Sequence, residues 1–190
     1  MKNKKGLIIA LAVIAVIVIF AGSIVSSYNS LVDERETVTN AQANIQTMLQ
    51  RRADLIPNLV NTVKGYAAHE EEVYTAIADA RSKLSGATTV DEMEKANSEL
   101  DSAISRLLVV VENYPELKAD TQFINLQDEL AGSENRISVA RKDYNDVAKA
   151  YNTHIKKFPA NIIASMLNFE QAEYFEASSE AQTAPSVNFD

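Results

Sequence analysis

The sequence has 190 residues and a formal net charge of −8 at pH 7. This acidic balance excludes nucleic acid as the main ligand, because phosphate binding needs a concentrated basic surface. The chain has no cysteine, which excludes disulfides, thiol catalysis, thiolate metal sites and a lipoprotein anchor. Its length allows one anchor and one domain, and its few glycine and proline residues favour helix.

An uncharged, mainly apolar stretch covers residues 7–25. As a helix it would span roughly 28 Å, which is close to the hydrocarbon thickness of a bilayer. A cleaved signal peptide is the alternative, since Ala21-Gly22-Ser23 resembles a cleavage site. The apolar part of a signal peptide is typically about 7–15 residues long, so the length favours an uncleaved transmembrane anchor.

Charges on either side of this stretch predict its orientation. Lys2, Lys4 and Lys5 precede it, whereas residues 33–36 follow it with a net negative charge. The positive-inside bias then places residues 1–6 in the cytoplasm and the rest of the chain outside, after a single membrane pass.

Four segments beyond the anchor have apolar residues at helical spacing. The first starts near Leu31 and is expected to kink at Pro57; it either ends at Gly65 or only bends there. The second covers residues 73–84. We predict an all-α fold, because no segment alternates like a strand.

The third and fourth segments carry recognisable caps. Thr89 and Glu92 form a capping-box pattern before the third, which stops at Pro115. Asp120 can cap the fourth, which ends at Phe158-Pro159. We therefore expect an antiparallel, up-and-down four-helix bundle over residues 28–169, with long first and last helices and Tyr66, Tyr144 and Tyr151 in its core. Residues 170–190 are expected to form a loosely held tail.

Several motifs resemble the LemA family of bacterial membrane proteins. The most distinctive is Gln50-Arg51-Arg52-Ala53-Asp54-Leu55-Ile56-Pro57-Asn58-Leu59-Val60. Tyr114-Pro115-Glu116-Leu117-Lys118-Ala119, Glu134-Asn135-Arg136-Ile137 and the closing Pro185-x-Val187-x-Phe189 also fit. The chain departs from the family pattern at Gln42, where tryptophan is frequent, and at Asp120-Thr121-Gln122, where the cap usually contains asparagine.

This resemblance implies an N-terminal anchor in the inner membrane of a bacterial cell, followed by a helical bundle. It supplies no biochemical activity. Genes of the family often lie beside those of membrane proteases or other envelope proteins, which implies an accessory role in the envelope.

Catalytic and metal-binding patterns are incomplete in this sequence. His69-Glu70 begins a zinc-protease motif, but position 73 is valine. The two Glu-x-x-His pairs of a di-iron bundle are missing, because Tyr66 and Tyr151 stand three residues before the two histidines. We expect no cofactor, no metal and no enzymatic activity, with a hydrolase of unrecognised site as the third hypothesis.

A candidate polar seam combines charged and amide residues of the first and fourth helices. Arg51 and Asp54 are expected to pair with each other, while Arg52 and Asn58 reach polar groups across the bundle. A structural role in packing is the favoured interpretation, and partner binding is the alternative. The seam consists of Arg51, Arg52, Asp54, Asn58, Glu134, Asn135 and Asp143.

A second candidate surface follows the fourth helix. Lys156, Lys157 and Phe158 are expected near the outer leaflet, before a short apolar helix in residues 159–169. That helix either caps the bundle core, which is the favoured interpretation, or contacts lipid. The leading functional hypothesis is a membrane-anchored scaffold or adaptor that binds an envelope protein, with a structural or lipid-associating protein as the alternative.

Overall fold

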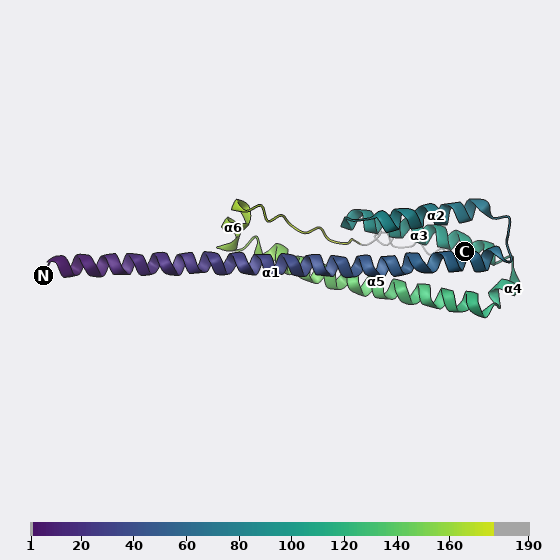
Figure 1. The fold of residues 1–190 in the computed structure, drawn as a ribbon, viewed down its shortest axis with the longest axis horizontal. Helices are drawn as coiled ribbons and strands as arrows, with labels where there is room; N and C mark the ends of the chain where they lie inside the picture. The colour runs from purple at the N-terminus through teal and green to yellow at the C-terminus, as the bar shows by residue number, and fades with distance from the viewer. Residues whose placement is uncertain (1, 177–190) are drawn as a thin grey trace, which may run out of the picture. The chain divides into compact units, whose positions relative to one another are not determined.

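The computed structural model describes residues 2–176, with side chains from Gly6 onward (Figure 1). The described residues form helices and no strand, which confirms the all-α class. The helices are α1 (Lys2–Lys64), α2 (Glu71–Gly86), α3 (Val90–Val111), α4 (Pro115–Lys118), α5 (Thr121–His154) and α6 (Ala160–Met166). A turn separates α1 from α2, so the helix ends at Gly65 and does not merely bend.

These helices belong to two compact units. Unit 1 comprises Met1–Ala41 and Asp146–Ala172, and unit 2 comprises Gln42–Asn145 and Glu173–Asp190. Both α1 and α5 contribute residues to each unit.

Unit 2 is the four-helix bundle expected from the sequence. Its part of α1, then α2, α3 and its part of α5 run in alternating directions (Figure 1). Their apolar stripes are buried, because each amphipathic helix removes its apolar face from water only against another. Tyr66 is the exception to the expected core: it is 41% exposed, and its hydroxyl donates to Asp120 Oδ2 at 3.0 Å.

Both predicted caps of unit 2 are confirmed. The Thr89 hydroxyl accepts from the Glu92 backbone N–H at 3.2 Å, and the Glu92 carboxylate accepts from the Thr89 N–H at 3.1 Å. Backbone N–H donation from Thr88, and then from Thr89, lowers the pKa of Glu92 to about 2. Asp120 accepts from the Phe123 N–H at 3.0 Å, and this bond lowers the pKa of Asp120.

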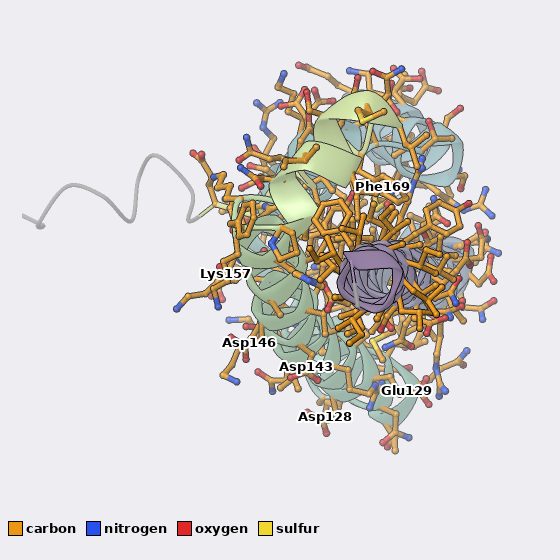
Figure 2. The ribbon with its side chains drawn as sticks, turned by 90° about the vertical axis from the view of Figure 1, so that its left-hand side faces the viewer. Asp128, Glu129, Asp143, Asp146, Lys157 and Phe169 are labelled. Atoms are coloured by element: carbon orange, nitrogen blue, oxygen red, sulfur yellow. The ribbon has the colours of Figure 1, made fainter. Side chains whose placement is uncertain are left out.

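Unit 1 contains the apolar start of α1. Among the described residues this is the one helix long and apolar enough to cross a membrane, and its most apolar window has a mean hydropathy of 3.1 and is 0% buried. Figure 2 shows the side chains of this stretch extending around the helix. Further along, Leu31 and Val38 are buried, as are Tyr151 of α5 and Ile155 directly after it.

The last described residues form an extended segment that is bound by asparagine and tyrosine side chains. In unit 1, Asn152 bonds both the N–H and the carbonyl of Ala172, each at 2.8 Å. In unit 2, Asn145 does the same to Phe175, at 3.0 and 2.8 Å. Tyr144 and Tyr151 donate to carbonyls of the segment, and burial raises the pKa of both hydroxyls. Residues 177–190, including the Pro185-x-Val187-x-Phe189 pattern, lie outside the described residues.

Candidate functional site: polar contacts of the bundle

Arg52 is the centre of a buried polar cluster in unit 2. Its side chain points from α1 and is almost fully buried, with the residue 4% exposed. One terminal nitrogen donates to Asn97 Oδ1 at 2.6 Å and to Glu134 Oε2, and the other donates to Asp101 Oδ1. Asn97 also donates to Asp101, at 3.2 Å. One guanidinium therefore connects α1 with α3 and α5.

The electrostatics of this cluster combine burial with access to water. Arg52 brings one positive charge into contact with two carboxylates, whose side chains remain 39% and 45% exposed. The buried charge is thus neutralised by close partners, while the excess negative charge stays hydrated. Charge-assisted bonds in the fixed fork geometry of arginine specify the rotation of α1 within the bundle.

A second polar contact lies one residue further along α1. Pro57 has no N–H, so the carbonyl of Ala53 lacks its usual partner within the helix. Arg81 of α2 donates to this carbonyl through Nε at 2.8 Å. Its Nη2 also lies 3.9 Å from Asp54 Oδ1. A side chain of α2 therefore supplies the hydrogen bond that Pro57 removes from α1.

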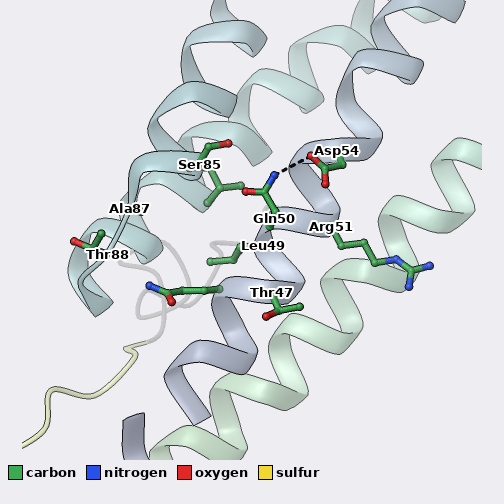
Figure 3. A pocket seen from close by; sticks show the side chains of 10 residues that line it. Thr47, Leu49, Gln50, Arg51, Asp54, Ser85, Ala87 and Thr88 are labelled. Carbon is green, nitrogen blue, oxygen red and sulfur yellow. Dashed lines mark hydrogen bonds between the residues drawn. The ribbon is translucent and has the colours of Figure 1, made fainter. Parts of the chain in front are cut away.

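Within the described residues, Arg51 and Asp54 do not form the expected ion pair with each other. Asp54 instead accepts from Gln50 at 2.8 Å. Arg51 and Asp54 both line a surface cleft of about 660 Å³. Figure 3 shows the Arg51 side chain extending away from Ser85 and Thr88, which lie on the other side of that cleft.

Most of the remaining seam residues are placed apart from Arg52. Asn58, Asn135 and Asp143 are exposed, and only Glu134 joins the buried cluster. Asn135 and Asp143 instead line a smaller cleft of about 270 Å³ between α1 and α5 of unit 2. Its apolar lining includes Met48, Ala140 and Val139, and Val139 is 60% exposed.

Sequence reasoning missed Asn97, Asp101 and Arg81. Asn97 could have been noticed, because it stands within the apolar stripe of α3 and is buried there. Asp101 follows it at i+4, which places the two on one helix face. Nothing local marks Arg81 as the partner of the Ala53 carbonyl.

The second candidate surface lies in unit 1. Lys156, Lys157 and Phe158 are all exposed between α5 and α6, and Figure 2 shows Lys157 directed outward. Nearby, His154 Nδ1 lies 2.9 Å from Glu34 Oε1. Among the residues that the structure describes, no group of three or more histidine, cysteine or acidic side chains is placed to hold a metal.

Comparison with known proteins places these features in a family. The model of the LemA family matches residues 41–189, which is most of the chain. The chain belongs to the LemA family. It is 30% identical over 152 residues to protein LemA of Metamycoplasma hominis, covering 79% of this chain and 69% of that protein. It is also 28% identical over 207 residues to magnetosome protein MamQ 2 of Paramagnetospirillum magneticum, covering 94% of this chain and 76% of the relative.

Another relative is magnetosome protein MamQ of Magnetospirillum gryphiswaldense, at 25% identity over 203 residues, covering 93% of this chain and 74% of that protein. These relatives and the exposed apolar start of α1 support a membrane-associated envelope protein. The names of these three relatives state no enzymatic activity.

Proposed function

We propose that this LemA-family protein is a non-catalytic, membrane-anchored adaptor of the bacterial envelope, whose bundle binds a partner protein outside the cytoplasm. Residues 7–25 would cross the inner membrane once, with residues 1–6 inside. The Arg52 cluster would serve packing, because its polar groups bond to one another across the helices.

The main support for partner binding is the cleft that contains Val139. An exposed valine beside Met48 and Ala140 offers an apolar centre, and Asn135 and Asp143 give it a polar rim. Protein interfaces commonly have this arrangement, and methionine adapts to varied partner surfaces. Since Arg52 and Glu134 join α1 to α5, the two walls of the cleft are held by a direct ion pair.

Site-specific photocrosslinking in the native membrane tests this proposal. A photoreactive amino acid at position 139 of the full chain should yield a discrete crosslinked product, to be identified by mass spectrometry. The matched control is position 109 of α3, where Val109 is similarly exposed but lies outside this cleft. Equal labelling at both positions, or no product at position 139, would contradict partner binding there. Recovery of a membrane protease as the crosslinked partner would support the further proposal that the protein is accessory to such a protease.

A further inference from the structure

Large apolar side chains are exposed on and beside α6. Phe158 is 78% exposed and Met166 is 76% exposed, which exceeds every large apolar residue described in the apolar start of α1. Ile162 and Leu167 are exposed as well. The opposite face of α6 is already buried through Ala160, Ile163 and Ala164. Capping a protein core therefore accounts for one face of this short helix and leaves the other unexplained.

The contacts of Phe169 determine how far α6 lies from the apolar stretch. The Phe169 ring packs edge-on against Tyr28 of α1, with 6.1 Å between ring centroids. Its backbone N–H donates to Ala164 of α6 at 3.0 Å, which ties the ring to that helix. Figure 2 shows Phe169 beside α1. Tyr28 comes three residues after Val25, the last apolar residue of the stretch, or roughly 4.5 Å further along the helix axis.

This distance corresponds to the headgroup layer of a bilayer, if residues 7–25 occupy the hydrocarbon. The headgroup regions add roughly 5–8 Å on each side of the hydrocarbon. Tyrosine is enriched in that layer, and arginine and lysine side chains extend into it. Arg35 places its guanidinium 5.9 Å from the Phe169 ring centroid, so a cation also lies next to this aromatic pair.

The positive charge just before α6 also favours a position in the headgroup layer. Lys156 and Lys157 are exposed and immediately precede Phe158. Neither lysine forms an ion pair with another described residue, so both ammonium groups are open to a ligand. Lysines beside exposed apolar residues match an anionic phospholipid surface, where the charges meet headgroups and the apolar groups meet acyl chains.

We propose that α6, together with residues 156–158 and Leu167, is a second membrane contact that lies in the interface beside the anchor. Phe158, Ile162, Met166 and Leu167 enter the acyl region, and Lys156 and Lys157 bind anionic headgroups. This inference rests on the proposed membrane anchor. It makes unit 1 a two-point attachment, and this restricts the rotation and tilt of unit 1 on the membrane.

Spin labelling of the full chain in anionic phospholipid vesicles tests the contact. Because the chain has no cysteine, single-cysteine variants can be labelled without removing native residues. Met166→Cys is compared with Ile14→Cys in the anchor and Val109→Cys in unit 2. Collision with oxygen, which partitions into lipid, is measured against collision with a water-soluble nickel chelate. We expect oxygen to dominate at positions 14 and 166 and nickel to dominate at position 109.

The outcomes separate this inference from the proposed anchor. A label at position 166 that behaves like position 109, while position 14 remains in lipid, overturns the α6 contact and leaves the anchor standing. A water-exposed label at position 14 overturns the anchor and the inference together. Low access to both reagents at position 166, with spin–spin broadening, shows a second copy covering this face and overturns the lipid contact.

The two lysines are tested in the same labelled background. Lys156→Glu with Lys157→Glu should shift the collision ratio at position 166 toward the value at position 109 in anionic vesicles. The ratio in neutral vesicles should not change. An identical ratio before and after charge reversal in anionic vesicles overturns headgroup binding by these lysines.

Discussion

At the residue scale, two adjacent positions of α1 have different roles. Arg51 is exposed on a cleft, whereas Arg52 is buried among Asn97, Asp101 and Glu134. The following residue, Ala53, presents a carbonyl that Pro57 leaves without a helical partner. The motif of residues 50–60 therefore combines a buried arginine with a missing backbone hydrogen bond in the helix.

Arg52→Ala should destabilise unit 2 strongly. Loss of the guanidinium leaves Asn97 without its donor and two carboxylates close together, so we expect a cost of about 3 kcal/mol in unfolding free energy. Arg51→Ala, at the exposed neighbour, should change it by no more than about 0.5 kcal/mol. Urea unfolding followed by circular dichroism measures both, and equal effects of the two substitutions would contradict the cluster.

The bond from Arg81 to the Ala53 carbonyl predicts coupling with Pro57. Arg81→Ala should cost about 1 kcal/mol, because that carbonyl then has no donor. In a Pro57→Ala background the helix regains an N–H for it, so the same substitution should cost measurably less. A double-mutant cycle of unfolding free energies tests this. Additive effects would show that Arg81 does not compensate for the proline.

At the scale of elements, some segments are fixed by local signals and others by contacts between residues far apart in the sequence. α3 begins at a capping box within four residues, whereas the extended segment after α6 is fixed by asparagines about 20 and 30 residues earlier in the chain. The first arrangement is local, and the second requires α5 to be in place.

The lowered pKa of Glu92 predicts a pH-dependent contribution of the cap. A carboxylate whose pKa falls to about 2 on folding, from an ordinary value of 4.5, stabilises the fold fully above that ordinary value. Its contribution is lost as the pH falls toward 2. Wild type should therefore be more stable than Glu92→Gln above about pH 5. Thermal unfolding across this range measures the difference, which should close on acidification; a pH-independent difference would argue against the cap.

The asparagine contact with Phe175 predicts local protection from hydrogen exchange. Asn145→Ala removes two hydrogen bonds to this residue, so its amide should exchange at least about tenfold faster. Asn135→Ala, at an exposed position of the same helix, should leave the rate unchanged. Exchange measured by NMR distinguishes the two. No change in Asn145→Ala would mean that packing of the Phe175 ring on Tyr144 holds the segment by itself.

At the scale of the whole molecule, the charges around the apolar stretch predict topology. Protease added to intact spheroplasts should degrade the bundle and spare an epitope placed before Lys2, because the three lysines hold the N-terminus inside. Permeabilised cells, in which the epitope becomes accessible, are the control. A bundle that survives in intact spheroplasts and disappears after permeabilisation would reverse the orientation.

The sequence by itself determined the helical class, the apolar stretch, the caps at Thr89 and Asp120 and most buried positions, because these depend on periodicity and on contacts within about one helical turn. It also predicted that Arg52 and Asn58 reach polar groups of the fourth helix, with Glu134, Asn135 and Asp143 as the candidates. It placed Tyr66 in the core, although this residue is exposed in the turn after α1 and binds Asp120.

Only the tertiary structure decided which helix faces meet and which polar groups pair across them. Arg52 is 45 residues from Asn97, and Arg81 is 28 residues from Ala53. Periodicity gives the apolar face of each helix but not its axial register against a neighbour, and a shift of one helical turn displaces a side chain by about 5.4 Å. That displacement exceeds the reach of a hydrogen bond, so packing of the helices selects the partners.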